Sequence, residues 1–376
     1  MHLRKISMLA MLLAFAMLAA ACGNSDTATT EVSLQDTSGG ETVLGRQGVF
    51  DKGEEETAPD DTTTTTIAEP IEIEDVSLRL DWLKGGGYHT GFYVALEKGF
   101  FEEAGFNVNI GDGQGSTSTV QLLAAGEDEF GYVAGTALVA AIAEGMPVIE
   151  VANMIPYTGL CTATLATSGL DTMASLNGRT WGGTAYGSST AIIDVILEAG
   201  GADPEQVQKV TLDTAALSVA FMEGTIDAFD VVRFSDAMEF EAAGVHINMF
   251  CHDQLGLDGI GWGLVVNTDD LASDPDRIAR FVAAAVKGYE WAYANKEEAG
   301  QIAFDFNEQL IEPAAMIALE LAEIEAVWDV QSQARYSQTD ENWATTIDIV
   351  NLVRSSTGDD PVEASAADVY TNDLLP

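Results

Sequence analysis

The segment from residue 80 to 108 constrains the fold most, because strand, turn and helix patterns follow one another within it. Apolar and polar residues alternate over 78–82, which is the period of a strand, and the three glycines at 85–87 end this pattern. Apolar residues then recur at steps of three and four over 91–105, which predicts a helix, and a second strand follows over 106–110. The segment is predicted to be one βαβ unit whose aromatic, glycine-rich turn forms a pocket wall.

The rest of the chain continues this alternation up to residue 267 and is then almost entirely helical. Strands are predicted over 129–133, 147–152, 180–183, 207–212, 226–231, 246–250 and 262–267, and helices over 116–125, 137–144, 189–199, 216–223, 234–243, 275–295, 296–306, 313–327 and 341–354. This order predicts an α/β protein in which a smaller α/β block is inserted into a larger one.

Two strand crossings, near 165–169 and 255–261, are predicted to join these blocks as a hinge. We expect 76–167 and 262–376 to form lobe 1, with the helical C-terminal segment packed on it, and 168–261 to form lobe 2. In open parallel sheets ligands bind beyond the carboxyl ends of the strands, so both lobes would present loops to one cleft. Hinge closure around a solute is the expected motion.

The N-terminus has the pattern of an export signal. Residues 1–21 combine a basic start, an apolar core too short to span a bilayer, and small residues before Cys22. We expect Cys22 to carry a lipid, and the alternative is an ordinary cleaved signal beside an incidental cysteine. Residues 22–75 are acidic, rich in threonine and nearly free of aromatics, which predicts a disordered tether to the membrane.

The charge of the chain excludes one class of partner. It has 60 acidic and 16 basic residues, a net charge of −44, and such a surface repels nucleic acid. Salt screens surface charges beyond about 8 Å, so the acidity does not decide the charge of a ligand. We interpret it as a surface adapted to salty water.

Aromatic residues flank the three glycines and are candidate ligand contacts. Trp82 and Tyr88 can each offer a ring face to a flat ligand. His89 precedes the predicted helix, whose positive end favours a neutral imidazole that can bind the polar edge of a heterocycle. The alternatives are that Trp82 belongs to the core and that His89 or Thr90 caps the helix.

Two glycine and hydroxyl turns precede helices, one in each predicted lobe. Free N–H groups and hydroxyls at a helix start can bind a carboxylate, sulfonate, phosphate or ring acceptor, although each turn can also be an ordinary cap. The candidate residues are Gly115, Ser116 and Thr117 in the first turn, and Tyr186, Gly187, Ser188 and Ser189 in the second.

Three polar residues near strand ends are further candidates. Asp230 can accept from an exocyclic amine, and the alternative is a local salt bridge with Arg233. Asn153 and Tyr157 follow an inner strand and offer similar contacts.

After Cys22 the chain has two cysteines, Cys161 and Cys251. In an exported protein they can form a disulfide, which would stabilise the fold by closing a long loop, or remain two buried thiols. The sequence leaves both possibilities open.

The motifs together resemble a known family. DW at 81–82 followed by HTGFYVALEKGFFEEAGFNV, then GDGQGSTSTVQLLAAGEDEFGYVAG, LNGRTWGGTAYGSST and the terminal YTNDLLP, resemble the SsuA/THI5-like (NMT1/THI5-like) solute-binding receptors of ABC importers, which take up thiamine-pyrimidine precursors, riboflavin, sulfonates and nitrate. The resemblance implies a two-lobed periplasmic-binding-protein-like fold of type II. It also implies that Trp82, His89 and the second turn line the pocket. Pyrimidine receptors tend to have a Pro-Asn turn where this chain has 84–86, Lys-Gly-Gly.

The resemblance implies a receptor that captures a small flat nutrient and passes it to the permease and ATPase of an importer. A thiamine pyrimidine precursor is the first choice of ligand, with riboflavin or a sulfonate or other small anion as alternatives. We expect a monomer at the cell surface or in the periplasm, anchored through Cys22.

An enzyme is the remaining alternative, because pyrimidine synthases belong to the same superfamily. Those enzymes have a cysteine cluster for iron, whereas Cys161 and Cys251 stand alone and the histidines are scattered at 2, 89, 246 and 252. No catalytic residue, metal site or cofactor is predicted.

Overall fold

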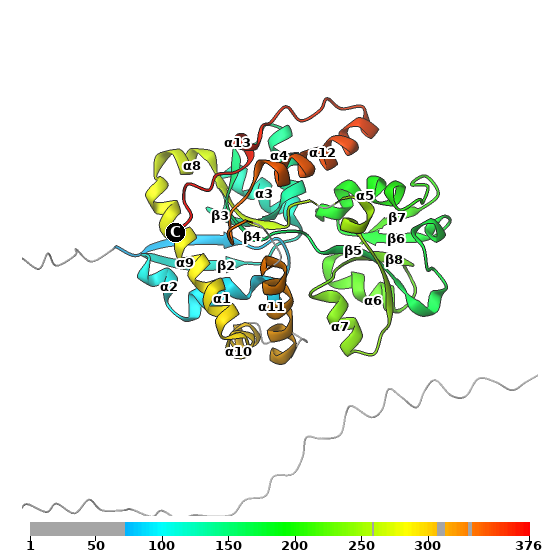
Figure 1. Ribbon diagram of the computed structural model, residues 1–376, viewed down its shortest axis with the longest axis horizontal. Helices are drawn as coiled ribbons and strands as arrows, with labels where there is room; N and C mark the ends of the chain where they lie inside the picture. Colours follow the sequence, from blue (N-terminus) through cyan, green and yellow to red (C-terminus); the bar gives the residue numbers. More distant parts are fainter. Residues whose placement is uncertain (1–71, 258, 307–312, 330–332) are drawn as a thin grey trace, which may run out of the picture. The chain divides into compact units, whose positions relative to one another are not determined.

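The computed structural model describes residues 72–257, 259–306, 313–329 and 333–376, which form two five-stranded sheets and their helices (Figure 1). The predicted signal peptide, Cys22 and residues 22–71 of the predicted tether lie outside the described residues. The first strand already begins at Glu74, so the predicted end of the tether at residue 75 is two residues too late. No described helix combines the length and hydrophobicity that crossing a membrane requires.

The first sheet is mainly parallel and deeply buried. Its strands, in spatial order, are β2 (Phe106–Gly111), β1 (Glu74–Arg79), β3 (Phe130–Ala134), β10 (Trp262–Asn267) and β4 (Val148–Ile155). β1 is parallel to β2 and β3, and β10 is antiparallel to both of its neighbours. Every residue of β3, β4 and β10 is buried, as expected for strands covered on both faces, whereas β2 buries alternate residues.

The second sheet has the same number of strands and a covalent link at one edge. Its strands, in spatial order, are β7 (Gln208–Thr211), β6 (Thr180–Gly183), β8 (Ala228–Val232), β5 (Leu160–Leu165) and β9 (Ile247–Cys251). β5 is antiparallel to β8 and β9. Cys161 and Cys251 lie opposite each other and are bonded, with 2.02 Å between the sulfur atoms. Of the two possibilities left open, the structure therefore has the disulfide.

Helices surround both sheets (Figure 1). They are α1 (Thr90–Glu97), α2 (Phe100–Glu103), α3 (Ser116–Ala125), α4 (Gly135–Ala143), α5 (Ser188–Ala199), α6 (Leu217–Met222), α7 (Asp236–Ala242), α8 (Thr268–Ser273), α9 (Pro275–Ala294), α10 (Lys296–Phe306), α11 (Ala314–Asp329), α12 (Asp340–Thr357) and α13 (Ala366–Val369); two of the short 3-10 helices, η1 (Gly87–His89) and η5 (His252–Leu255), adjoin the site. The C-terminal helix α12 packs on α4 and also on α5.

The packing of α1 on α9 positions the aromatic turn. α9 begins with Pro275 in its first turn, and the Asp274 side chain accepts from the backbone N–H of Arg277 at 2.9 Å, which caps the helix. A side chain on Gly288 would come within 2.2 Å of the Gly91 carbonyl oxygen, so only glycine permits this close approach. The neighbouring Tyr289 hydroxyl then donates to the carbonyl oxygen of Tyr88 at 2.6 Å, which fixes that residue.

The structure confirms the α/β alternation and differs from the predicted elements at three places. Trp82 lies beyond β1, because the backbone there turns and the Trp82 carbonyl oxygen accepts from Gly113 N–H at 2.8 Å. The helix predicted over 91–105 is two helices, separated at Gly99, whose φ is 73°. The strand β5 was not predicted, so the chain passes from the first sheet to the second between 155 and 160, earlier than the crossing predicted near 165–169.

Glu150 on β4 is a buried carboxyl group that makes stability depend on pH. Burial raises its pKa from 4.5 to about 8, although Gln338 donates to Oε1 at 2.9 Å. Between pH 5 and 8 the folded protein keeps a proton that the unfolded chain has lost. The free energy of unfolding therefore falls as pH rises, by about 1.4 kcal/mol per pH unit.

We expect Glu150→Gln to remove this slope. Between pH 5 and pH 8, the free energy of unfolding measured in urea should fall by about 4 kcal/mol more for the wild type than for the variant. Equal losses in the two proteins would show that Glu150 does not retain its proton.

Candidate ligand-binding site

A cavity of about 120 Å³ lies between the two sheets. From the first-sheet side it is lined by Asp81, Trp82 and Tyr88; from the second-sheet side it is lined by Leu160, Trp181, Gly182, Gly183, Thr184, Gly187, Ser188, Ser189, Thr190, Thr214, Leu217, Ser218, Phe229, Asp230, Val232 and Asp236. Trp82 is partly buried and packs against the apolar cluster of the second sheet, which includes Leu217 and Phe229. Both sides therefore supply apolar surface to the same cavity.

The polar lining is rich in acceptors. It contains three carboxylates, Asp81, Asp230 and Asp236, and several hydroxyls, whereas none of the described lining residues is lysine or arginine. A ligand that fills this cavity meets negative charge without a positive side chain to balance it.

Asp81 is held by two donors behind the cavity wall. His89 Nε2 lies 2.9 Å from its Oδ1, and the indole N–H of Trp262 donates to its Oδ2 at 2.7 Å. Asp81 is 5% exposed and His89 is fully buried, so this cluster is shielded from water. Burial, followed by the charge of Asp81, raises the pKa of Tyr88 well above its usual value, which keeps the phenol protonated beside the cavity.

Asp230 occupies the opposite wall. Its Oδ1 accepts from the Thr162 hydroxyl at 2.8 Å and from the indole N–H of Trp181 at 3.3 Å. His252 Nε2 lies 3.6 Å from Oδ2. The salt bridge predicted as an alternative does not form, because Arg233 pairs with Asp253 at 3.4 Å and donates to the Tyr157 hydroxyl.

Asp236, the third carboxylate, opens α7. Its Oδ2 accepts from the backbone N–H of Val232 at 2.7 Å, and burial raises its pKa to about 6. At neutral pH this side chain is mostly ionised, so it adds negative charge to the cavity.

The start of α5 supplies the donors of the cavity. Gly187, Ser188 and Ser189 line it, and the N–H groups in the first turn of a helix have no partner within that helix. The hydroxyl of Thr184 is buried and has no hydrogen-bond partner among the described residues. A ligand acceptor facing this wall can use these donors.

The other predicted turn does not line the cavity but connects its two sides. Gly115 N–H donates to the Asp81 carbonyl oxygen at 2.7 Å, and Thr117 N–H donates to the Tyr186 carbonyl oxygen at 3.3 Å. The Ser116 hydroxyl accepts from Ala134 N–H at 3.0 Å. Thr117 and Tyr186 therefore join the two sides of the cleft, and the backbone of Gly115 lies against that of Tyr186, whereas the bond of Ser116 stays within the first-sheet side.

Three more predicted residues lie away from the cavity. His89 sits behind Asp81 rather than against the ligand space, because its ring nitrogen binds that carboxylate. Asn153 is fully buried within β4. Tyr157 lines a second cavity of about 550 Å³ beside the strand crossings, together with Arg233 and Asp253. Of the predicted ligand contacts, the structure brings Trp82, Tyr88, Gly187, Ser188, Ser189 and Asp230 to one cavity.

Asp81, Trp181 and Asp236 line the cavity but were not among the predicted ligand contacts. Asp81 was counted as the polar partner in a strand alternation, yet it stands directly before Trp82, and that adjacency was an available signal. Asp236 lies in the first turn of α7, and acidic residues are common at that position in helices that bind no ligand, so its position gave no signal. Trp181 is a buried strand residue, and nothing local distinguishes it from core.

Comparisons with known proteins place the chain in a family. Residues 87–299, more than half of the chain, match the family described as NMT1/THI5 like, and the chain belongs to it. It is similar to the formylaminopyrimidine-binding protein of Halalkalibacterium halodurans, with 28% identity over 240 residues that cover 63% of this chain and 72% of that protein.

Two further similarities concern an enzyme and a solved structure. A 4-amino-5-hydroxymethyl-2-methylpyrimidine phosphate synthase of Saccharomyces cerevisiae is 26% identical over 257 residues, covering 64% of this chain and 73% of the enzyme. The periplasmic aliphatic sulphonate binding protein SsuA of Escherichia coli superposes with a TM-score of 0.60 and 16% identity, covering 76% of this chain and 90% of that chain. This superposition confirms the predicted periplasmic-binding-protein-like fold.

Proposed function

We propose that the chain is the solute-binding receptor of an ABC importer and that it captures a small aminopyrimidine of the thiamine-precursor kind between its two lobes. One observation carries the proposal: a small cavity lined by Trp82 and by three carboxylates, with no lysine or arginine among the described lining residues. The similar protein of Halalkalibacterium halodurans is named for binding a formylaminopyrimidine, which agrees with this ligand class.

The size of the cavity favours a single ring. A cavity of about 150 Å³ in another protein accommodates benzene, and the cavity here is about 120 Å³. An unsubstituted pyrimidine ring is of the size of benzene, and the substituents of a thiamine precursor need additional space that a small opening of the lobes would provide, whereas the three fused rings of riboflavin are much larger still. We therefore rank riboflavin below a pyrimidine.

The charge of the cavity disfavours a sulfonate or another small anion. A unit negative charge about 4 Å from a carboxylate is repelled by roughly 4 kcal/mol at an effective dielectric constant of 20. The start of α5 can attract an anion, but Asp81 and Asp230 on opposite walls oppose it. An aminopyrimidine suits both features, because its amine donates to carboxylates and its ring nitrogens accept from the helix start.

The receptor proposal includes its partners and its place in the cell. A permease and ATPase complex would receive the ligand, a lipid on Cys22 would hold the monomer at the outer face of a membrane, and the predicted tether, shortened to end before β1 begins at Glu74, would link the two. The lobes would follow the two sheets, with the first crossing at the connection between β4 and β5.

A binding experiment that also follows the fate of the ligand separates receptor from enzyme. Refolded, ligand-free protein is titrated calorimetrically with 4-amino-5-hydroxymethyl-2-methylpyrimidine, and the ligand is then recovered and analysed by mass spectrometry. We expect saturable binding of one molecule per chain and unchanged ligand after long incubation. Consumption of the ligand would support the enzyme, and absence of binding would refute the proposed ligand class.

A further inference from the structure

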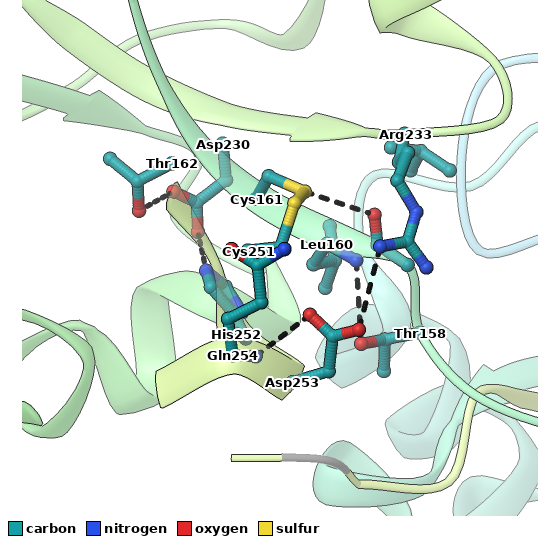
Figure 2. Close-up of a disulfide and its surroundings, with 12 residues drawn as sticks. Thr158, Leu160, Cys161, Thr162, Asp230, Arg233, Cys251, His252, Asp253 and Gln254 are labelled. Carbon is teal, nitrogen blue, oxygen red and sulfur yellow. Dashed lines mark hydrogen bonds and ion pairs between the residues drawn. A yellow bond between two sulfur atoms is a disulfide. The ribbon is translucent and has the colours of Figure 1, made fainter. Parts of the chain in front are cut away.

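The two residues that directly follow the bridged cysteines contact the same carboxylate, Asp230 (Figure 2). Thr162 follows Cys161 and donates its hydroxyl to Asp230 Oδ1 at 2.8 Å. His252 follows Cys251, and its Nε2 lies 3.6 Å from Oδ2, which is slightly beyond hydrogen-bond distance; both atoms are buried and have no other hydrogen-bond partner among the described residues. The side chains of His252 and Asp230 are 3% and 7% exposed, so this contact lies inside the protein.

The strand order makes the disulfide the covalent tie between these two supports. β5 carries Thr162, which lies opposite Asp230 of β8, so this contact belongs to the interior of the sheet. β9 leads to His252 and is an edge strand, which among the described strands pairs only with β5. Strands at the edge of a sheet unfold locally more readily than central strands. The Cys161–Cys251 bond ties β9 covalently to β5 at the residue next to His252.

The opposite wall of the cavity has a related arrangement that needs no disulfide. Asp81 is held by His89 and by the indole N–H of Trp262 on the central strand β10, while Asp230 is approached by His252 and by the indole N–H of Trp181. Both walls thus present an aspartate backed by a histidine and a tryptophan. The histidine behind Asp81 is anchored in the core beside α1, whereas the one behind Asp230 follows an edge strand.

We propose that His252 and the Cys161–Cys251 disulfide position the Asp230 carboxylate for the ligand, so that the disulfide contributes to ligand recognition as well as to stability. His252 is a positioning residue, because it acts through Asp230 and does not itself line the cavity. The inference rests on the proposed function, since the ligand must carry a donor that Asp230 accepts.

The first experiment removes the disulfide and compares the variant with an equally disruptive change elsewhere. The double variant Cys161→Ala/Cys251→Ala is titrated with 4-amino-5-hydroxymethyl-2-methylpyrimidine below its unfolding temperature. Leu176→Ala is the matched control, because Leu176 is fully buried in the second-sheet region and does not line the cavity. We expect the double variant to bind about tenfold to hundredfold more weakly, and the control to bind like the wild type. Wild-type affinity in the double variant would overturn the proposal.

Single substitutions at His252 test the same idea with the disulfide intact. His252→Gln keeps a polar N–H group that can approach Asp230 Oδ2 and should retain most of the affinity. His252→Leu removes the donor and should weaken binding about tenfold or more. Equal affinity in both variants would contradict a positioning role.

A ligand-free measurement separates failure of this inference from failure of the proposed function. Burial holds the pKa of His252 below its usual value, although the charges of Asp230 and Asp253 act in the opposite direction. In NMR titrations, Asp230→Asn should lower the His252 pKa when the disulfide is present and change it much less in the cysteine double variant. The same change in both backgrounds would show that the disulfide does not hold the pair together, whatever the ligand is.

Discussion

Trp82→Ala should weaken binding of 4-amino-5-hydroxymethyl-2-methylpyrimidine by about 30-fold to 1000-fold, the loss typical of a central tryptophan contact worth about 2 to 4 kcal/mol. Trp82 lines the cavity from the first-sheet side and packs against the apolar cluster of the second sheet. Removing the indole would take away a ring face for the ligand and part of the contact between the two sides. Calorimetric titration measures the loss.

Two variants show whether this loss is specific to the ring face. Trp82→Phe keeps an aromatic face and should lose less than about tenfold. Trp291→Ala removes another partly buried tryptophan, which packs on the first-sheet core away from the cavity, and should leave the affinity unchanged. Near-normal binding by Trp82→Ala would contradict stacking and would favour an anion held at the start of α5.

Gly115→Ala should weaken binding about tenfold to hundredfold by preventing the two sides of the cleft from closing. Gly115 has a φ of 128° and a ψ of 148°, a backbone conformation almost restricted to glycine, and alanine there costs about 1 to 3 kcal/mol. A side chain on Gly115 would also lie 2.1 Å from the carbonyl oxygen of Tyr186, which belongs to the opposite side. Ligand affinity and the radius of gyration in solution scattering report the effect.

The control lies at the other end of the same helix. Gly126, which ends α3, has a φ of 69°, and a side chain there would meet nothing within 4 Å. Gly126→Ala should lower stability through backbone strain and keep the affinity and the compact, ligand-bound form. If both variants bind equally well, Gly115 is not a closing contact.

The sequence predicted correctly those elements whose limits are marked by residues within or next to the element itself. Helix α3 and strand β10 occupy the predicted ranges, because the glycines around α3 and the continuous apolar run of β10 mark their limits. Strand β5 was missed because its sequence, LCTATL, mixes small and polar residues, and its burial depends on β8 and β9, which lie far along the chain. The position of the first crossing depends on that same pairing.

The sequence predicted those cavity residues that lie in turns beside the cavity, namely Trp82, Tyr88 and the residues at the start of α5. His89 was placed on the cavity because it adjoins that turn, but its ring is turned toward Asp81. This orientation depends on Trp262, which approaches the same carboxylate from the distant strand β10. The role of the turn at 115–117 likewise depends on Tyr186, a partner from the other side that no local pattern reveals.

If the proposal is right, the cavity recognises a single ring through donors that the ring presents to carboxylates. The most direct measurement compares, by calorimetry on ligand-free protein, 4-amino-2-methylpyrimidine with 2-methylpyrimidine, which lacks the amine, and with ethanesulfonate. We predict saturable binding of the amine, binding at least about tenfold weaker without it, and no binding of the sulfonate. Tight binding of ethanesulfonate, or equal binding of the two pyrimidines, would contradict the proposal.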